Sequence, residues 1–328
     1  MKKLNLSNKK ILYLGPLFFA YDQYIINKLR ELGAEVTAFE IYTNSFKFRL
    51  ITKISTSFLQ YFKNAYYNKA LAQEGYDYVL VRHGYQLTEE FYKKLREINP
   101  NAAIINFHWD SLKPEYDYRS IIKYFNKVYS FDYKDCEIYK EVNYLPLFYI
   151  DEYSKFQHAN ENIKPIRYDL LFIGAWRNPE RYRLIKLTDH LAKEKNLQFY
   201  YYLHLSTKDQ KVSIKEGVTP KESRDKLLSH IDILKYFLVS NTIIDFPSSF
   251  QSGLTMRTFE ALGAGKKLIT TNQNIKKEPF YNEEYINIID TNNIILDRDF
   301  IRASPKTSIS RIMEDYSIEN YIYKLLQE

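Results

Sequence analysis

The sequence predicts an α/β protein with two doubly wound parallel sheets that face a central cleft. Short β-rich runs alternate with helical stretches from residue 9 onward, a polar stretch at 150–167 breaks the alternation, and a second series begins at residue 168. Apolar runs separated by helices of this length are typical of βαβ units. The chain of 328 residues is also longer than one core usually supports, which favours two domains.

The first series has its helices between its strands. A helix is expected over 21–33, where Gly33 is a typical residue just past a helix end, and over 88–99, where Thr88 can cap a start that is rich in acids. The expected strands span 9–15, 35–41, 76–84, 102–109, 127–132 and 144–149.

The second series follows the polar stretch, which contains a proline and lacks sustained periodicity, as an interdomain linker does. We expect an N-terminal domain over 1–155, a linker over 156–167, a C-terminal domain over 168–310, and a final segment, 311–328, that returns to the N-terminal domain. The expected elements are strands 168–176, 197–205, 241–246, 266–272 and 285–290, and helices 178–195, 221–240 and 317–328.

Cysteine usage and hydropathy bear on the compartment. The single Cys136 excludes an internal disulfide framework and a cysteine-built metal site, and it fits a reducing cytoplasm. The first apolar run is short and interrupted by Gly15-Pro16, so it predicts a strand rather than a signal peptide. No stretch approaches the roughly 20 apolar residues of a membrane span. We expect a cytoplasmic protein, peripheral on the inner face of the cell membrane.

The net charge of +7 suits a nucleic acid, an anionic membrane or a phosphorylated substrate. Between Ile41 and Gln73 there is no Asp or Glu, and lysines and Arg49 are interleaved with aromatic and aliphatic residues. Residues 46–70 therefore either lie on an anionic membrane surface or form an amphipathic helix on their own domain. We expect no nucleic-acid partner.

Candidate site residues follow the strands, because open parallel sheets bind ligands beyond the carboxyl ends of their strands. The stretch SGLTMRTFEALGAGKKLITTN, 252–272, begins a helix whose N-terminal N–H groups can attract phosphate. Small and hydroxyl residues there, Ser252, Gly253, Thr255 and Thr258, would let an anion approach. Arg257 could add a bidentate clamp, which would explain a cation at a helix N-terminus.

Arg257 and Glu260 lie three residues apart and share a helix face. One interpretation is a local ion pair worth a few tenths of a kcal/mol. The other, which we favour, has Glu260 accepting hydrogen bonds from ribose hydroxyls while Arg257 holds a diphosphate. Gly263 and Gly265 then end the helix and allow tight packing onto the next strand.

Several familiar motifs are excluded. GAGKK at 263–267 lacks the first glycine of a P-loop, since Glu260 stands there, and it follows a helix instead of preceding one. LDRDF at 296–300 contains an Asp-x-Asp that could grip a metal diphosphate, but it is more typical of an acidic helix start. We expect neither a metal nor another cofactor.

The stretch 252–272 resembles the donor-binding motif of GT-B glycosyltransferases, with its Gly-containing loop, its helical Arg-x-x-Glu, and ALGAG before KLITTN. The nearest likeness is to bacterial enzymes of surface-polysaccharide and lipopolysaccharide assembly, including the spore-coat-type branch with Arg-x-Phe-Glu. Further similar segments are FHWDSLK (107–113), SFDYKDC (130–136), YLPLFY (144–149) and YDLLFIGAWRNPERY (168–182).

The resemblance implies two Rossmann-like domains, with a nucleotide-sugar donor held mainly by the second and a glycan or lipid-linked acceptor held by the first. On this basis Gly174, Trp176 and Arg177 line the cleft near the donor, unless Trp176 is a core aromatic. Gly15 begins a loop near the donor diphosphate or an ordinary β–α turn. Ser252 stands where many retaining members have a second Glu, which leaves retention and inversion open.

An inverting enzyme needs a carboxylate or imidazole to deprotonate the acceptor hydroxyl. Asp110, after the strand 102–109, is our first choice, and His83, at the end of the strand 76–84, is our second. A structural role for His83 is equally compatible with its position. Asp22 is expected to serve only the start of its helix.

The function expected from these features is glycosyl transfer from a nucleotide sugar to a glycan or lipid-linked acceptor in bacterial surface-polysaccharide assembly. Fold alone does not settle the chemistry. The alternatives are a nucleotide-sugar epimerase or hydrolase on the same architecture, and a non-catalytic protein that binds nucleotide sugars at a membrane surface.

Overall fold

The computed structural model divides the chain into two compact units. Unit 1 combines Met1–Pro146 with Ile318–Glu328, and unit 2 is Leu147–Ser317. Each unit contains a six-stranded parallel sheet, so the predicted α/β class with two parallel sheets is confirmed. The described residues are 4–17, 20–41, 65–85, 87–112, 119–158, 166–205, 215, 218, 223–224, 226–248 and 250–327.

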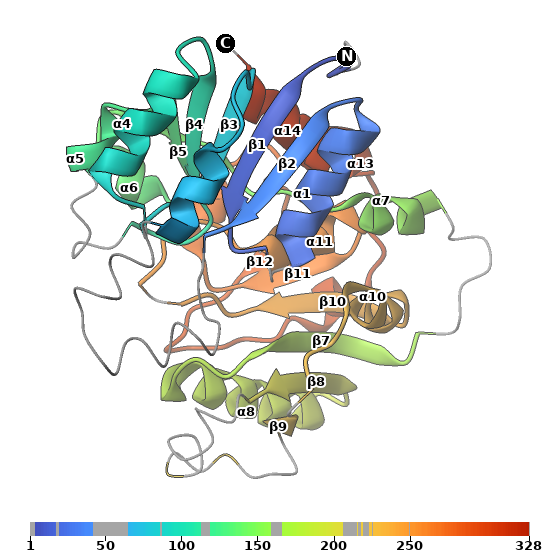
Figure 1. The fold of residues 1–328 in the computed structure, drawn as a ribbon. Helices are drawn as coiled ribbons and strands as arrows, with labels where there is room; N and C mark the ends of the chain where they lie inside the picture. Colours follow the sequence, from blue (N-terminus) through green and yellow to red (C-terminus); the bar gives the residue numbers. More distant parts are fainter. Residues whose placement is uncertain are drawn as a thin grey trace. The chain divides into compact units, whose positions relative to one another are not determined.

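The sheet of unit 1 has the strand order β2-β1-β3-β4-β5-β6, and every pairing is parallel (Figure 1). Its strands read as apolar runs because both faces of the central strands are buried. The strands are β1 (Lys10–Gly15), β2 (Glu35–Glu40), β3 (Tyr78–Arg82), β4 (Ala103–His108), β5 (Lys127–Ser130) and β6 (Val142–Tyr144).

Helix α4 (Glu89–Ile98) shows how the local sequence produces the predicted element. Thr88 accepts a hydrogen bond from the Phe91 amide at 3.2 Å and so satisfies one of the unpaired N–H groups of the first turn. Phe91, Tyr92 and Leu95 share one face of the helix and are buried against the sheet core. Removing the cap would weaken the helix start by about 1 kcal/mol.

The last helix, α14 (Ile318–Leu326), belongs to unit 1 and lies against α1 (Ala20–Glu31), although the two come from opposite ends of the chain. The Trp109 indole N–H donates to the Tyr321 hydroxyl of α14 at 2.9 Å. Residues from both ends of the sequence therefore complete the first core.

The sheet of unit 2 has the strand order β12-β11-β10-β7-β8-β9, again with parallel pairings only. Helices α8 (Pro179–Glu194) and α11 (Met256–Gly263) begin where the sequence predicts. A side chain at Gly263 would collide with the Tyr149 ring, which explains the close packing at the end of α11. The strands are β7 (Tyr168–Ala175), β8 (Phe199–His204), β9 (Ser223–Arg224), β10 (Ser240–Asp245), β11 (Lys267–Thr270) and β12 (Ile286–Ile288).

Three segments differ from the expectation. The strand expected over 144–149 ends at Tyr144, because Pro146 has no N–H to donate to a sheet ladder, and Tyr149 pairs instead with Ser317 in an isolated bridge. The polar stretch expected to be a linker begins with α7 (Asp151–His158). Within 221–240 the described residues contain the short β9 and a helix α10 that spans only His230–Leu238.

Short elements were not expected, since periodicity needs a window of about 11 residues to be read. Among the described residues they include α5 (Arg119–Ile122), α6 (Tyr133–Ile138), α12 (Arg298–Arg302), α13 (Ser310–Met313), and the 3-10 turns η1 (Asn68–Leu71), η3 (Gln273–Lys277) and η4 (Glu314–Tyr316).

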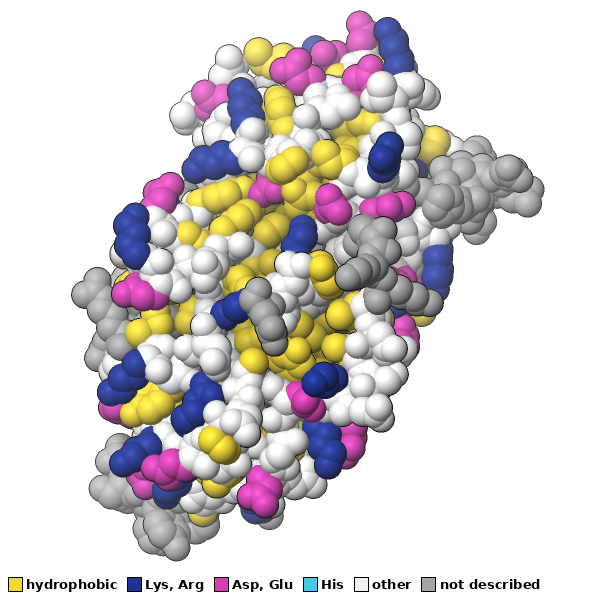
Figure 2. All heavy atoms as spheres, turned by 90° about the horizontal axis from the view of Figure 1, so that it is seen from above, with side chains coloured by type: hydrophobic (Ala, Val, Ile, Leu, Met, Phe, Trp, Pro, Cys, Tyr) yellow, Lys and Arg dark blue, Asp and Glu magenta, His cyan; other side chains and the backbone are white. Residues whose placement is uncertain are grey.

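Helix length and the distribution of basic residues bear on membrane contact. None of the helices in the described ranges is long and apolar enough to cross a bilayer. Residues 42–64, which hold most of the expected membrane stretch 46–70, lie outside the described residues, so that expectation stays a prediction. On the face seen in Figure 2, Lys and Arg side chains are scattered among Asp and Glu and do not form one continuous basic stripe.

Candidate functional site

The carboxyl edge of the unit 2 sheet carries a pocket of about 200 Å³. Strands β7, β10 and β11 end here at Ala175, Asp245 and Thr270, and the loops that follow them supply the walls. This is the edge at which open parallel sheets bind ligands. The lining residues are Asn178, Glu180, Arg181, Leu184, Pro247, Ser248, Gln251, Thr271, Asn272, Gln273 and Thr291.

Among the described residues that line this pocket, Arg181 is the cation, and it was not predicted from the sequence as a site residue. It stands in the first turn of α8, where the Asn178 side chain accepts from the Arg181 amide at 2.9 Å and Pro179 occupies an early position. The Arg181 Nη1 donates to the Ala175 carbonyl at 3.1 Å, while its buried Nε has no hydrogen-bond partner among the described residues. Burial lowers the pKa of Arg181, although a guanidinium stays charged near neutral pH.

Asp245 is a buried carboxylate between two arginines. It accepts hydrogen bonds from the Thr255 hydroxyl at 2.6 Å and the Thr258 hydroxyl at 3.3 Å. Burial raises the pKa of Asp245, and the threonine hydroxyl, Arg181 and Arg257 act against that rise. The two threonine hydroxyls that we expected to face an anion are therefore directed at Asp245 in this structure.

Arg257 and Glu260 form the local ion pair that the sequence left as the alternative. Arg257 Nη1 lies 2.7 Å from Glu260 Oε2, and the exposed fractions of their side chains are 15% and 2%. The Arg257 guanidinium also stands over the Phe237 ring, 5.3 Å from its centroid. The expected ligand roles of both residues stay predictions.

The Glu260 carboxylate is enclosed by side chains from two other helices. His230 Nδ1 of α10 lies 3.7 Å from Glu260 Oε1, and the Tyr153 hydroxyl of α7 interacts with the same carboxylate. Burial raises the pKa of the Tyr153 hydroxyl and lowers the pKa of His230. Glu260 is thus a buried carboxylate with partners on three helices, α7, α10 and its own α11.

The loop before α11 is held by two asparagines. The Asn272 Nδ2 donates to the carbonyl of Gly253 at 3.0 Å and to that of Ser252 at 3.2 Å. Asn274 Nδ2 donates to the Ser252 carbonyl at 3.0 Å. Ser252 and Gly253 are buried, so the loop is a fixed wall whose shape depends on residues after β11.

The segment after β7 divides between core and surface. Trp176 is buried in the hydrophobic core of unit 2, as its core alternative would have it, and its indole nitrogen has no hydrogen-bond partner among the described residues. A Cβ on Gly174 would lie 2.8 Å from the Phe172 ring, so the glycine permits this packing. Arg177 is exposed and close enough to influence the pKa of Arg181. Only Arg177 of these three presents an open side chain.

The carboxyl edge of the unit 1 sheet holds a second arginine–carboxylate pair. Arg82 Nε lies 2.7 Å from Asp22 Oδ1, and the Tyr13 hydroxyl donates to the same oxygen at 2.6 Å. Asp22 is fully buried, which corrects our expectation that it serves only the start of α1. A Cβ on Gly15 would lie 2.7 Å from Tyr13 Cε1, so the absence of a side chain at Gly15 serves the packing of this cluster.

The two candidate bases lie together at this edge. His83 Nε2 is 3.4 Å from Asp110 Oδ2, and the side chains are 4% and 78% exposed, respectively. Arg82 Nη1 lies 2.9 Å from His83 Nε2. A guanidinium can only donate, so His83 Nε2 is the acceptor in this contact. His83 is therefore the less available base of the two in this arrangement.

His108 is a buried histidine whose ring is neutral. Asn106 donates through Nδ2 to the carbonyls of Val81 and His83, so its Oδ1 accepts from His108 Nε2 at 2.5 Å. Burial, with a smaller contribution from Arg82, lowers the pKa of His108 to about 3. His108 is thus a structural imidazole whose Nδ1 accepts a hydrogen bond from the Tyr85 hydroxyl at 3.2 Å.

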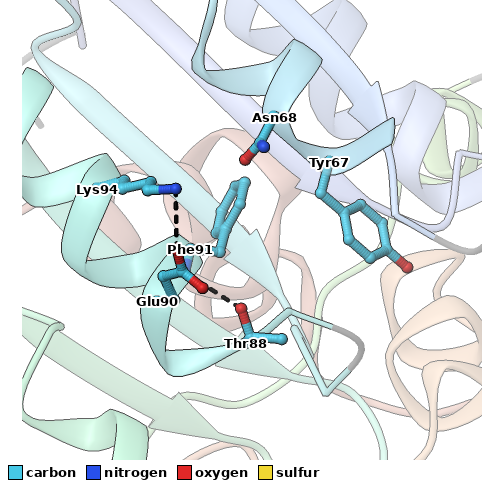
Figure 3. A pocket seen from close by; sticks show the side chains of 6 residues that line it. All are labelled: Tyr67, Asn68, Thr88, Glu90, Phe91 and Lys94. Atoms are coloured by element: carbon cyan, nitrogen blue, oxygen red, sulfur yellow. Dashed lines mark hydrogen bonds and ion pairs between the residues drawn. The ribbon is translucent and has the colours of Figure 1, made fainter. Parts of the chain in front are cut away.

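A separate pocket of unit 1 holds none of the predicted site residues. It measures about 90 Å³ and is lined by Tyr67, Asn68, Thr88, Glu90, Phe91 and Lys94 (Figure 3). Lys94 Nζ pairs with Glu90 at 3.0 Å, and Thr88 caps α4. These polar groups stabilise the helix, and we assign the pocket no ligand.

The Asp-x-Asp segment has a structural use. Asp297 caps α12, with Oδ1 accepting from the amides of Asp299 at 2.9 Å and Phe300 at 3.0 Å. Within the described ranges, no cluster of three or more His, Cys, Asp or Glu side chains is arranged to hold a metal ion.

No protein-family model and no curated protein matches this sequence. Solved structures match it at low identity. The apo structure of OtsA is 13% identical, with a TM-score of 0.59 over 98% of this chain and 100% of that one. An α-glucosyltransferase in complex with UDP and DNA is 13% identical, with a TM-score of 0.55 over 97% and 94%.

A third match shares the architecture with a different chemistry in its name. The putative UDP-N-acetylglucosamine 2-epimerase from Listeria monocytogenes is 12% identical, with a TM-score of 0.54 over 97% of this chain and 94% of that one. At such identities the likeness shows the fold alone. The chain has the GT-B-like fold that the resemblance implied.

Proposed function

We propose that this chain is a glycosyltransferase that moves a sugar from a nucleotide-sugar donor to a glycan or lipid-linked acceptor. One observation carries the proposal, namely the pocket of about 200 Å³ beyond β7, β10 and β11, into which α8 brings Arg181. Arg181 is half-buried at this pocket, and a cation there favours an anionic ligand.

The chemistry of this edge suits a diphosphate. Arg181 belongs to the first turn of α8, a helix of 16 residues whose N-terminal N–H groups favour anions. Arg177 is exposed directly before the Asn178 cap of that helix, and Arg257 acts on the same buried Asp245 as Arg181. These three guanidinium groups are balanced in number by the carboxylates Asp245, Glu260 and the pocket residue Glu180. The attraction for the leaving nucleoside diphosphate therefore comes from the position of Arg181 at the helix N-terminus.

Glu260 has a positioning role in this proposal. Its Oε2 holds Arg257 at 2.7 Å, and its other partners are His230 and Tyr153. Contact with a ribose hydroxyl would require the carboxylate to exchange one of these partners. Phe250, which is 86% exposed and adjacent to the pocket residue Gln251, offers a ring face on which a nucleobase can stack.

Structures with nucleotides support this ligand class. HepE from Anabaena, in complex with UDP and glucose, is 11% identical with a TM-score of 0.54 over 97% of this chain and 99% of that one. The catalytic domain of starch synthase IV from Arabidopsis thaliana, bound to ADP and acarbose, is 10% identical with a TM-score of 0.51 over 98% and 96%. A uridine or adenosine diphosphate is therefore the first probe to use.

The reaction we propose breaks the bond between the anomeric carbon and the diphosphate and forms a bond from that carbon to an acceptor oxygen. The nucleoside diphosphate leaves with the electron pair, and the acceptor hydroxyl loses its proton. In an inverting reaction the proton could go to the protein, and Asp110 is then the better acceptor because it is exposed. His83 is less suitable because its Nε2 already accepts a hydrogen bond from Arg82 Nη1. The assignment to surface-polysaccharide assembly is supported only by the sequence resemblance.

An epimerase or hydrolase is the second candidate, since the Listeria structure has the same fold. We would incubate the full chain with radiolabelled UDP-sugars, with and without a bacterial lipid-linked glycan extract. If the chain transfers sugar, label should appear in the lipid-linked glycan of the incubation with extract, and no free sugar should form without it. Free sugar or an epimer without the extract would establish the second candidate, and binding without either product would indicate a non-catalytic protein.

A further inference from the structure

Unit 2 has another pocket on the flank of its sheet where α10 packs. The pocket measures about 420 Å³, and its walls come from the starts of β7 and β10, from α10, and from the segment that follows β9. Tyr168 begins the eight-residue β7, so this part of the wall lies roughly 25 Å from the end of β7, where we place the donor. The lining used below is Arg167, Tyr168, Lys226, Asp232, Lys235 and Tyr236.

Stacked tyrosines make one wall rigid. Tyr168 stacks on Tyr200 with centroids 4.9 Å apart, and Tyr200 stacks on Tyr236 at 5.0 Å. The hydroxyls of Tyr200 and Tyr236 lie 3.2 Å apart, within hydrogen-bond distance. The Arg167 guanidinium stands 5.2 Å from the centroid of the Tyr168 ring. This arrangement fixes Arg167 at the pocket without the use of a carboxylate.

The described residues that line this pocket carry a positive net charge. They include Arg167, Lys226 and Lys235 and one carboxylate, Asp232, which pairs with Lys235 at 3.0 Å. Asp232 is already occupied by Lys235 and by the Ser229 hydroxyl at 2.8 Å. Charge complementarity therefore favours an anionic partner.

Large apolar side chains are exposed beside these cations. Ile166 precedes Arg167, Leu227 follows Lys226, and Ile231 precedes Asp232, with exposed fractions of 45%, 70% and 62%. Isolated exposed aliphatic residues are ordinary, but here each directly adjoins a charged lining residue of one pocket, basic for Ile166 and Leu227 and acidic for Ile231. A soluble sugar phosphate would bind the cations and leave these aliphatic side chains in water.

We propose that this surface, defined by Ile166, Arg167, Lys226, Leu227, Ile231 and Lys235, docks onto an anionic lipid bilayer. Arg167 and the lysines contact lipid phosphates, while the aliphatic side chains enter the boundary between headgroups and acyl chains. The pocket receives one headgroup beside Arg167 and the tyrosine wall. None of these surface residues belongs to the stretch 46–70.

The test uses flotation of the full chain with vesicles of phosphatidylcholine, or of an equimolar mixture with phosphatidylglycerol. Binding to the anionic vesicles alone is expected. Lys226→Ser with Lys235→Ser should weaken it about 25-fold, at roughly fivefold for each basic residue. Leu227→Ser with Ile231→Ser should weaken it about tenfold, since both side chains lose partial burial.

Matched controls change the same residue types elsewhere. Ile138→Ser with Ile295→Ser removes two aliphatic side chains that are 63% and 62% exposed, and Lys94→Ser with Lys193→Ser removes two exposed lysines. Both controls should bind vesicles as the unchanged chain does. UDP binding should be the same in all variants, which separates this proposal from the proposed function and shows that the variants fold.

Three results would overturn the proposal. The first is unchanged vesicle binding in the lysine and aliphatic surface variants, or no binding by the unchanged chain. The second is displacement from vesicles by millimolar inorganic phosphate, which would indicate a site for a free anion. The third is self-association without lipid that Leu227→Ser with Ile231→Ser abolishes, because the surface would then be an interface between copies of this chain.

Discussion

The carboxyl edges of the two sheets each contain an arginine 2.7 Å from a buried carboxylate, yet the two pairs have different surroundings. In unit 1 the Arg82–Asp22 pair is enclosed by Tyr13 and by Trp109, whose ring centroid is 4.6 Å from the Arg82 guanidinium. In unit 2 both Arg257 of the pair and Arg181 interact electrostatically with Asp245, and Arg181 lines a pocket.

A buried ion pair does not by itself identify a binding site. Each pair needs its partner, because removing one member leaves a desolvated charge. What separates the two edges is the additional cation Arg181, which lines a pocket of unit 2. The predictions below test whether unit 1 uses its pair for folding and unit 2 uses its pair to hold a ligand-binding cation.

The largest stability effect is expected from Asp22→Ala. The change leaves the Arg82 guanidinium buried without its carboxylate, and the free energy of unfolding should fall by about 3–5 kcal/mol. Urea unfolding measures this loss. Glu90→Ala, which breaks the exposed pair with Lys94, is the control and should change stability by less than about 1 kcal/mol. A loss below that of the control would mean that the Arg82 pair does not organise unit 1.

A smaller loss is expected from Glu260→Gln. Arg257 retains contact with the Phe237 ring and some exposure to water, so the cost should be about 1–3 kcal/mol. UDP affinity should fall together with stability, because the guanidinium loses its fixed position. Calorimetric titration at a temperature where the variant is fully folded separates the two quantities. Unchanged UDP affinity would remove Glu260 from the donor site.

The pH dependence of stability should change in Asp245→Asn. Burial raises the pKa of Asp245 in the folded state, so the folded chain binds this proton more tightly than the unfolded chain. The stabilisation from this group is complete below the unfolded pKa of about 4 and is lost as pH rises through the raised value. The variant should therefore gain stability relative to the unchanged chain as pH rises from about 4.

Thermal unfolding of both proteins at several pH values measures this difference. A difference that stays constant, or that shifts against the variant as pH rises, would contradict the raised pKa of Asp245.

The smallest effect is expected at His108, where no titration should be seen. With its pKa lowered to about 3, the ring should stay neutral between about pH 5 and about pH 8 and carry its proton on Nε2. Nitrogen-15 NMR of the histidine rings distinguishes the tautomers. A change of the His108 ring signals near pH 6.5, the ordinary histidine value, would show that unit 1's carboxyl edge is open to water.

The sheets were predictable because their signal is local. Each strand such as β1 or β10 is a short apolar run, and Thr88 and Gly33 mark helix ends by chemistry that depends on a few neighbouring residues. The short α10 and the helix α7 were not predictable, since polar residues and interrupted periodicity conceal helices that are stabilised by tertiary packing.

The position of the site after the strands of unit 2 could be predicted, but the side chains that contact its charged residues could not. Arg257 and Glu260 could be paired from their spacing, whereas the enclosure of Glu260 depends on Tyr153 and His230, which are distant in sequence. Asp22 meets Arg82 across sixty residues, so a helix-start role was the only local interpretation. Arg181 was missed because its segment also reads as an ordinary helix start with Pro179.

Titration of UDP into Arg181→Met and Lys193→Met tests the proposed donor site most directly. Both residues belong to α8, but Arg181 lines the pocket, whereas Lys193 is exposed and pairs with Asp189 at 2.7 Å. We expect Arg181→Met to lower UDP affinity about 100-fold, as for a desolvated charged contact, and Lys193→Met to leave it unchanged. Equal affinities in the two variants, or no measurable UDP binding by the unchanged chain, would contradict a donor site at this edge.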